Sequence, residues 1–121
     1  MVRRLSIVVV ASNAAVGMAT ARRLNERHDA QLTTSAMEAI ATLKRGCFDV
    51  VVCDQELEPV TAGELFEILS LFFPKVRRVL QVGGACPPRN ESTAVLLQDG
   101  LAQAVIARGS RVDALSAIVE G

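Results

Sequence analysis

An aspartate at the end of an apolar run is the residue of this sequence best placed to do chemistry. Asp54 closes the strand-like run at residues 48–54. A lone carboxylate at the tip of a strand in an α/β pattern indicates an acceptor for a phosphoryl group. A second run, residues 7–10, should supply acidic partners, but it leads into Ala, Ser and Asn at residues 11–13. The spacing therefore indicates a phosphoryl-acceptor site that has lost the carboxylates needed to hold a metal ion.

Short β-branched runs and stretches of helical period alternate along the chain. Strands are predicted at residues 5–10, 30–33, 50–53, 79–82 and 104–107. The first, third and fourth of them lack polar alternation, which is typical of strands buried on both faces. Helical periods fall at residues 16–24, 37–43, 65–72 and 112–119. The order β-α repeated five times predicts a doubly wound, five-stranded parallel sheet with helices on both faces.

Sites in such sheets form beyond the carboxyl ends of the strands. That edge is expected to bring together residues 11–13, 54–56, 82–84 and 107–109. Helix-capping patterns support the same element boundaries. The capping pairs are Ser35 with Glu38, Thr61 with Glu64 and, more loosely, Ser110 with Asp113, and Gly46 suits a helix end.

Length and composition predict a single domain, residues 1–121, with an aliphatic core. Half of the residues are hydrophobic, and the four phenylalanines are the only aromatic residues among Phe, Trp and Tyr. Thirteen basic and thirteen acidic side chains cancel. No overall field would therefore draw the chain to nucleic acid or to an anionic membrane.

The cysteines and the amino-terminal sequence indicate a soluble protein of a reducing cytoplasm. Cys47, Cys53 and Cys86 follow no metal or disulfide spacing. Cys53 is expected to pack as a small hydrophobe and Cys86 to be an ordinary loop thiol. The first apolar run has about six residues, which is too short for a signal-peptide core or a membrane span.

Four features together carry a resemblance to a known family. They are the runs at residues 7–10 and 48–54, Glu64-Leu65 ten residues after Asp54, and Phe73-Pro74 before the fourth strand. With them the chain resembles, over essentially its whole length, the receiver domain of two-component response regulators. The resemblance implies a flavodoxin-like (βα)5 fold and places Asp54 at the phosphoacceptor position.

The resemblance also shows what the phosphoacceptor site lacks. In the family, Mg²⁺ is held by the phosphoacceptor aspartate and by acidic residues just after the first strand, where this chain has Ala11 and Ser12. No cofactor is expected, and Mg²⁺ is the one ion left open, with Asn13, Asp54 and Glu56 as its candidate ligands.

The switch positions of the family are altered as well. Its hydroxyl residue after the fourth strand falls on Val82 or Gly83, so the hydroxyl is missing on either alignment. Its lysine after the fifth strand falls on Arg108, which keeps a positive charge in a longer, planar and forked group. The usual proline that follows is Gly109, and the aromatic residue of the fifth strand falls at about Val105.

The same residues can also have purely structural roles. Asp54 can be a retained strand-end carboxylate that caps a loop or pairs with Arg108. His28, at the end of the first helix, is expected to be a surface or helix-end residue. Phe72 and Phe73 are expected to close the core.

Three functions remain open. The first is a degenerate receiver, not an enzyme, that acts in signal transduction as a phosphorylation-independent protein-interaction module. The second is a weak phosphoacceptor modified at Asp54 by a histidine kinase. The third, a haloacid-dehalogenase-type phosphatase that uses residues 54–56, is disfavoured because Glu56 stands where an aspartate is needed and the chain has no room for a cap domain. A dinucleotide site at residues 12–17 fails because it has a single glycine.

The expected partners are a protein or output domain and a histidine kinase. The resemblance points to the fourth helix, fifth strand and fifth helix as the surface for partners or for a homodimer. That region is apolar through Val95, Leu96, Leu97, Leu101, Val105, Val112 and Leu115, most of which are expected to lie in the core.

Overall fold

The computed structural model describes residues 4–83 and 96–121. The strands are β1 (Ser6–Val10), β2 (Asp29–Thr33), β3 (Val50–Asp54), β4 (Arg77–Val82) and β5 (Ala104–Ala107). The helices are α1 (Ala14–Leu24), α2 (Ala36–Arg45), α3 (Ala62–Phe72) and α5 (Val112–Glu120). Residues 96–98, at the start of the second described range, are helical and lie in the region of the predicted fourth helix.

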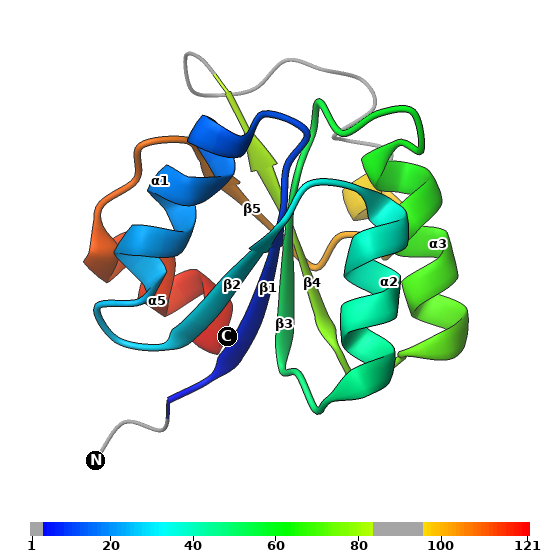
Figure 1. Cartoon of the computed structure of the whole chain (residues 1–121), viewed down its shortest axis with the longest axis horizontal. Helices are drawn as coiled ribbons and strands as arrows, with labels where there is room; N and C mark the ends of the chain where they lie inside the picture. Colours follow the sequence, from blue (N-terminus) through cyan, green and yellow to red (C-terminus); the bar gives the residue numbers. More distant parts are fainter. Residues whose placement is uncertain (1–3, 84–95) are drawn as a thin grey trace.

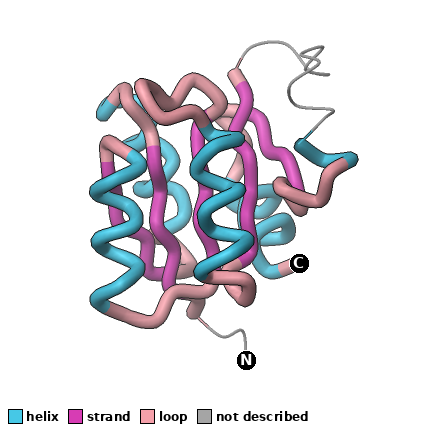
Figure 2. Tube along the Cα trace, turned by 90° about the vertical axis from the view of Figure 1, so that its right-hand side faces the viewer, coloured by secondary structure: helices cyan, strands magenta, loops and turns pink. Residues whose placement is uncertain are grey.

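The five strands form one parallel sheet with the order β2-β1-β3-β4-β5. Helices α1 and α5 cover one face, and α2 and α3 lie side by side on the other (Figure 1; Figure 2). The predicted doubly wound, five-stranded parallel sheet is therefore confirmed.

The central strands β1, β3 and β4 are largely apolar because each contributes to two cores. Val8, Val51 and Leu80 point toward α2 and α3, where they pack with Leu65, Phe66 and Leu69 among others. Their chain neighbours Ile7, Val9, Val50, Val52 and Val79 point toward α1 and α5. Alternate residues of a strand face opposite sides of the sheet, so helices on both sides require a continuous apolar run.

Two of the three predicted helix caps are confirmed. Thr61 and Glu64 form a complete capping box, in which the bonds from Thr61 lower the pKa of Glu64. The Ser35 hydroxyl accepts a hydrogen bond from the Glu38 amide. The looser pattern at Ser110 was wrong, because its hydroxyl instead donates to the Ala107 carbonyl at 2.6 Å and α5 begins after an N-cap without a side-chain bond.

His28 was wrongly predicted to be a surface or helix-end residue, since α1 already ends at Leu24. The His28 side chain is completely buried, because the chain between α1 and β2 passes beneath the carboxyl end of α5. The ring Nδ1 accepts a hydrogen bond from the Leu5 amide at 3.1 Å, and Nε2 faces the Glu120 carboxylate at 3.4 Å. His28 thus joins the start of β1 to the end of α5.

The two adjacent phenylalanines at the end of α3 have different environments. Phe73 packs against the core, as predicted, but Phe72 is 72% exposed, so its predicted core role was wrong. Adjacent residues at a helix end point in directions about 100° apart, and only one of them faces the sheet.

The described part of the chain contains no helix with the length and apolar character needed to cross a lipid bilayer. Cys53 is buried in the core as predicted, and burial, together with the neighbouring charge of Asp54, raises the pKa of its thiol. Cys86 lies outside the described residues.

Candidate functional site

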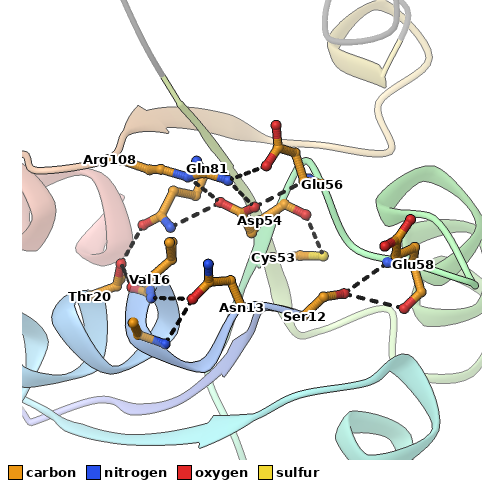
Figure 3. A network of polar contacts seen from close by, with 11 residues as sticks. Ser12, Asn13, Val16, Thr20, Cys53, Asp54, Glu56, Glu58, Gln81 and Arg108 are labelled. Atoms are coloured by element: carbon orange, nitrogen blue, oxygen red, sulfur yellow. Dashed lines mark hydrogen bonds and ion pairs between the residues drawn. The ribbon is translucent and has the colours of Figure 1, made fainter.

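The candidate site lies where β3, β4 and β5 end side by side (Figure 3). The register pairs Asp54 with Gln81 and Val82 with Ala107. Arg108 is the first residue beyond β5. Because the three strands are parallel, their carboxyl ends lie at the same edge of the sheet, and Arg108 reaches Asp54 across the end of β4. The sheet itself thus places the two charged residues together, although 54 positions separate them in the sequence.

Asp54 and Arg108 form a bidentate ion pair, which confirms the structural pairing predicted as one possibility from the sequence. The guanidinium donates from Nε to Oδ1 at 2.9 Å and from Nη2 to Oδ2 at 2.5 Å. Asp54 is only 3% exposed. The planar fork of arginine matches both carboxylate oxygens at once, which a lysine cannot do. The hydrogen bonds to Asp54 raise the pKa of Arg108, so this side chain stays charged.

Gln81 of β4 contacts the same carboxylate and was not predicted as a site residue from the sequence. It is 1% exposed, and its Nε2 donates to Asp54 Oδ1 at 3.2 Å. Its Oε1 accepts from the buried Thr20 hydroxyl of α1 at 2.6 Å. A carboxylate only accepts hydrogen bonds, which fixes the orientation of the amide. The available signal was that Gln81 is the one polar residue within the apolar run at residues 79–82.

Asp54 accepts four hydrogen bonds from the described residues, since the Glu56 backbone amide also donates to Oδ2 at 3.2 Å. The Glu56 side chain extends the pair by accepting from Arg108 Nη2 at 3.1 Å. That carboxylate is 71% exposed, so its contribution to stability is small. The buried charge of Asp54 is thus satisfied from β4, from Arg108 and from its own turn.

The two candidate positions for the missing hydroxyl differ in their surroundings. Val82 packs in the core beneath α3, whereas Gly83 lies directly beside Arg108. A Cβ atom at Gly83 would come within 2.7 Å of Arg108 Nη1. The missing side chain therefore provides the space through which Arg108 reaches Asp54.

The turn after Arg108 also departs from the family pattern. Gly109 has a φ of 78°, a left-handed conformation that glycine adopts easily. Proline, with φ locked near –65°, cannot adopt it. The turn that follows Arg108 therefore has a backbone conformation that the usual proline would not allow.

Replacing Gly83 with alanine is expected to lower the free energy of unfolding by about 1–2 kcal/mol, because the new methyl group pushes the guanidinium off Asp54. Urea titration measures this loss. In an Arg108→Ala background the clash partner is gone, so the cost of Gly83→Ala is expected to vanish. An equal cost in both backgrounds would show that Gly83 does not make room for Arg108.

The candidate Mg²⁺ ligands are already engaged within the protein. Asn13 Oδ1 caps α1 by accepting from the amides of Ala15 and Val16 at 3.0 and 3.3 Å. Both oxygens of Asp54 accept from Arg108, and Glu56 contacts the same guanidinium. A cation placed among them would face the positive charge of Arg108. With their oxygens engaged in this way, the side chains of Asn13, Asp54 and Glu56 do not fit a Mg²⁺ site.

The remaining strand-end residue, Ser12, is also occupied. Its hydroxyl accepts from the Glu58 amide at 3.0 Å and donates to the Glu58 carbonyl at 3.2 Å, which ties the end of β1 to the turn after β3. Ala11 is buried. Across residues 4–83 and 96–121, no three His, Cys, Asp or Glu side chains gather as a metal site requires.

An open depression of about 800 Å³ lies beside Asp54. It is lined by Ser12, Asn13, Asp54, Glu56, Leu57, Glu58, Pro59 and Thr61. Its walls come from the ends of β1 and β3 and from the turn before α3, so a small solute can approach the site from this side.

Comparison with solved structures identifies the fold. The chain superposes on a response regulator receiver domain protein from Methanospirillum hungatei with a TM-score of 0.82 at 19% identity, over 98% of this chain and 92% of that one. It matches the signal receiver domain of an HD domain-containing protein from Pseudomonas fluorescens with a TM-score of 0.82 at 18% identity, over 98% and 93%. A response regulator receiver domain protein from Clostridium thermocellum gives 0.81 at 14%, over 96% and 91%.

By sequence, no protein-family model and no curated protein matches the chain. The structural matches nevertheless cover 98% of it with TM-scores of 0.82. The chain therefore has the fold of response regulator receiver domains, and the predicted flavodoxin-like (βα)5 class is confirmed.

Proposed function

We propose that this receiver-fold chain is a signal-transduction module that binds a protein partner without being phosphorylated. The observation that supports it most strongly is the ion pair between Asp54 and Arg108. A phosphoacceptor needs a carboxylate oxygen free to attack and a metal to neutralise the transferring group. Here both oxygens of Asp54 are bound to a guanidinium.

The same contacts support a conformation fixed by the sequence itself. In this proposal Arg108 permanently supplies beside Asp54 the positive charge that a bound metal ion would otherwise provide. Gln81 and Thr20 extend the contact from Asp54 to α1. The ends of β3, β4 and β5 and the helix α1 are then held in one arrangement, and the proposed module acts by binding rather than by turnover.

We place the partner on the surface formed by residues 96–98, β5 and α5. Leu97 is 43% exposed there, and Val105 is partly buried. Leu115 is buried in the core, as expected for most of this apolar set, and Val95 lies outside the described residues. One of the matched solved structures is a receiver domain of an HD domain-containing protein, which supports an output domain as one kind of partner. A homodimer through this surface is the other arrangement proposed from the sequence.

A second candidate function is a weak phosphoacceptor, modified at Asp54 by a histidine kinase. The depression beside Asp54 favours it, because a phosphodonor could approach from that side. Phosphorylation would then require Arg108 to swing away from the carboxylate and Mg²⁺ to be recruited by Asn13 or Glu56. In the proposed function neither event takes place.

Titration with Mg²⁺ and beryllium fluoride, followed by amide NMR, separates the two functions. The interaction module is expected to show no saturable shift at residues 54–56, 81–83 or 107–109, because no carboxylate oxygen is free to bind the ligand. The Asp54→Asn variant is the matched control for nonspecific shifts. Saturable shifts in the wild type that are lost in this variant would favour the phosphoacceptor.

A further inference from the structure

The outer surface of α2 and α3 is unusually apolar for a face that no part of the described chain covers. Met37, Leu71 and Phe72 are 71%, 75% and 72% exposed. A groove of about 360 Å³ runs between the two helices and is lined by Ile40, Lys44, Ile68, Phe72 and Phe73. We call these residues, together with Met37 and Leu71, the α2–α3 face. Large apolar side chains gathered around a groove mark an interaction site.

Charged residues are ordered along the same two helices. Both helices follow parallel strands and run in the same direction (Figure 1; Figure 2). The acidic side chains Glu38, Glu64 and Glu67 lie in their first two turns, and the basic side chains Lys44, Arg45 and Lys75 lie at or just beyond their last turns. Within the described ranges, no carboxylate lies at ion-pair distance from Lys44 or Lys75.

We infer that the α2–α3 face binds a second copy of this chain, with the helices of the two copies antiparallel. A two-fold axis across the helices would place the basic end of each copy against the acidic end of the other. A symmetric interface of this kind must be complementary to itself. The order of charges meets this requirement, because the same contact between an acidic end and a basic end forms at both ends of the interface.

The exposed apolar residues of the α2–α3 face also fit an antiparallel dimer with a two-fold axis. Met37 is in the first turn of α2, and Phe72 is the last residue of α3, so the antiparallel arrangement brings Phe72 of one copy toward Met37 of the other. An exposed aromatic side chain beside a groove is the type of residue that dominates binding energy in interfaces. A parallel arrangement would instead bring the basic ends of the two copies together, where Lys44 and Lys75 would repel their counterparts' positive charges.

This dimer does not depend on the proposed function. The α2–α3 face lies on the opposite side of the sheet from α5, and none of its residues contacts Asp54 or Arg108 through a hydrogen bond or ion pair. It is also distinct from the surface of residues 96–98, β5 and α5. A dimer that is weakened by a substitution in the α2–α3 face, and not by one in the other surface, therefore tests the inference alone.

Sedimentation equilibrium of the wild type is expected to show a reversible monomer–dimer system. Phe72→Ser should weaken it at least about tenfold, whereas Leu97→Ser, which removes an exposed leucine from the other surface, should leave it unchanged. Thermal unfolding verifies that both variants fold. A wild type that stays monomeric, or a dimer that Leu97→Ser breaks and Phe72→Ser does not, would overturn the inference.

A charge exchange tests the antiparallel arrangement. Lys44→Glu should weaken the dimer about tenfold, because it places a carboxylate opposite Glu38 of the second copy. Adding Glu38→Lys to the same chain should restore the affinity, since the exchanged charges again meet across the two-fold axis. Failure of the double variant to recover affinity above the single variant would rule out this arrangement.

Discussion

Replacing Arg108 with alanine is expected to lower the free energy of unfolding by about 2–3 kcal/mol. Asp54 is 3% exposed in the wild type, and the variant leaves its carboxylate with only Gln81 and the Glu56 amide as donors. Breaking a fully buried ion pair costs about 3–5 kcal/mol, and the 29% exposure of the Arg108 side chain reduces the expected value. Urea unfolding followed by circular dichroism measures the loss.

Two further variants make this result specific to the ion pair. Arg111→Ala removes an exposed arginine three residues away that makes no side-chain cap bond, and its expected cost is below about 0.5 kcal/mol. Adding Asp54→Asn to Arg108→Ala should recover about 1 kcal/mol, because it removes the unpaired buried charge. If Arg108→Ala and Arg111→Ala cost the same, Arg108 does not stabilise Asp54.

Replacing His28 with alanine is expected to lower the free energy of unfolding by about 2–4 kcal/mol. The ring is completely buried, so its removal leaves a cavity between the α1–β2 connection and α5. It also leaves the Leu5 amide without the acceptor that it has at 3.1 Å. Thermal and urea unfolding measure the combined loss.

The contacts of the two ring nitrogens can be separated. Glu120→Ala removes only the half-exposed carboxylate that faces Nε2, so its expected cost is below about 1 kcal/mol. His28→Asn should recover part of the stability of His28→Ala, since a side-chain oxygen could accept from the Leu5 amide. A cost near zero for His28→Ala would contradict the burial of the ring and its role in joining β1 to α5.

The strands could be predicted from the sequence because their signal is local. Apolar β-branched runs mark strands buried on both faces, and the parallel order follows from the alternation with helices. The same local logic found the caps at Ser35 and Thr61, where the two members of a pair are three residues apart. It failed at Ser110, whose hydroxyl has a backbone acceptor of its own in the preceding turn.

The candidate site was only partly predictable. Asp54 and Arg108 were found because each follows a recognisable strand, and the parallel register then joins them. Gln81 and its contact with Thr20 were missed, because nothing local shows that a polar residue inside an apolar run faces a carboxylate from another strand.

The two errors of burial have a common physical cause. His28 is polar and Phe72 is aromatic, so residue type alone predicts the first to be exposed and the second to be buried. The structure does the reverse, because α5 covers His28 and no described element covers Phe72. Burial of such residues depends on which distant element packs over them, and it cannot be inferred from the residue type alone.

The central claim is that Arg108 holds Asp54 in a structural ion pair that excludes phosphorylation. Intact-mass measurement after incubation with acetyl phosphate and Mg²⁺ tests it most directly, with Asp54→Asn as the matched control. We expect the wild type and this variant to show the same mass as the untreated proteins. A saturable gain of one phosphoryl group in the wild type, absent from Asp54→Asn, would contradict the claim.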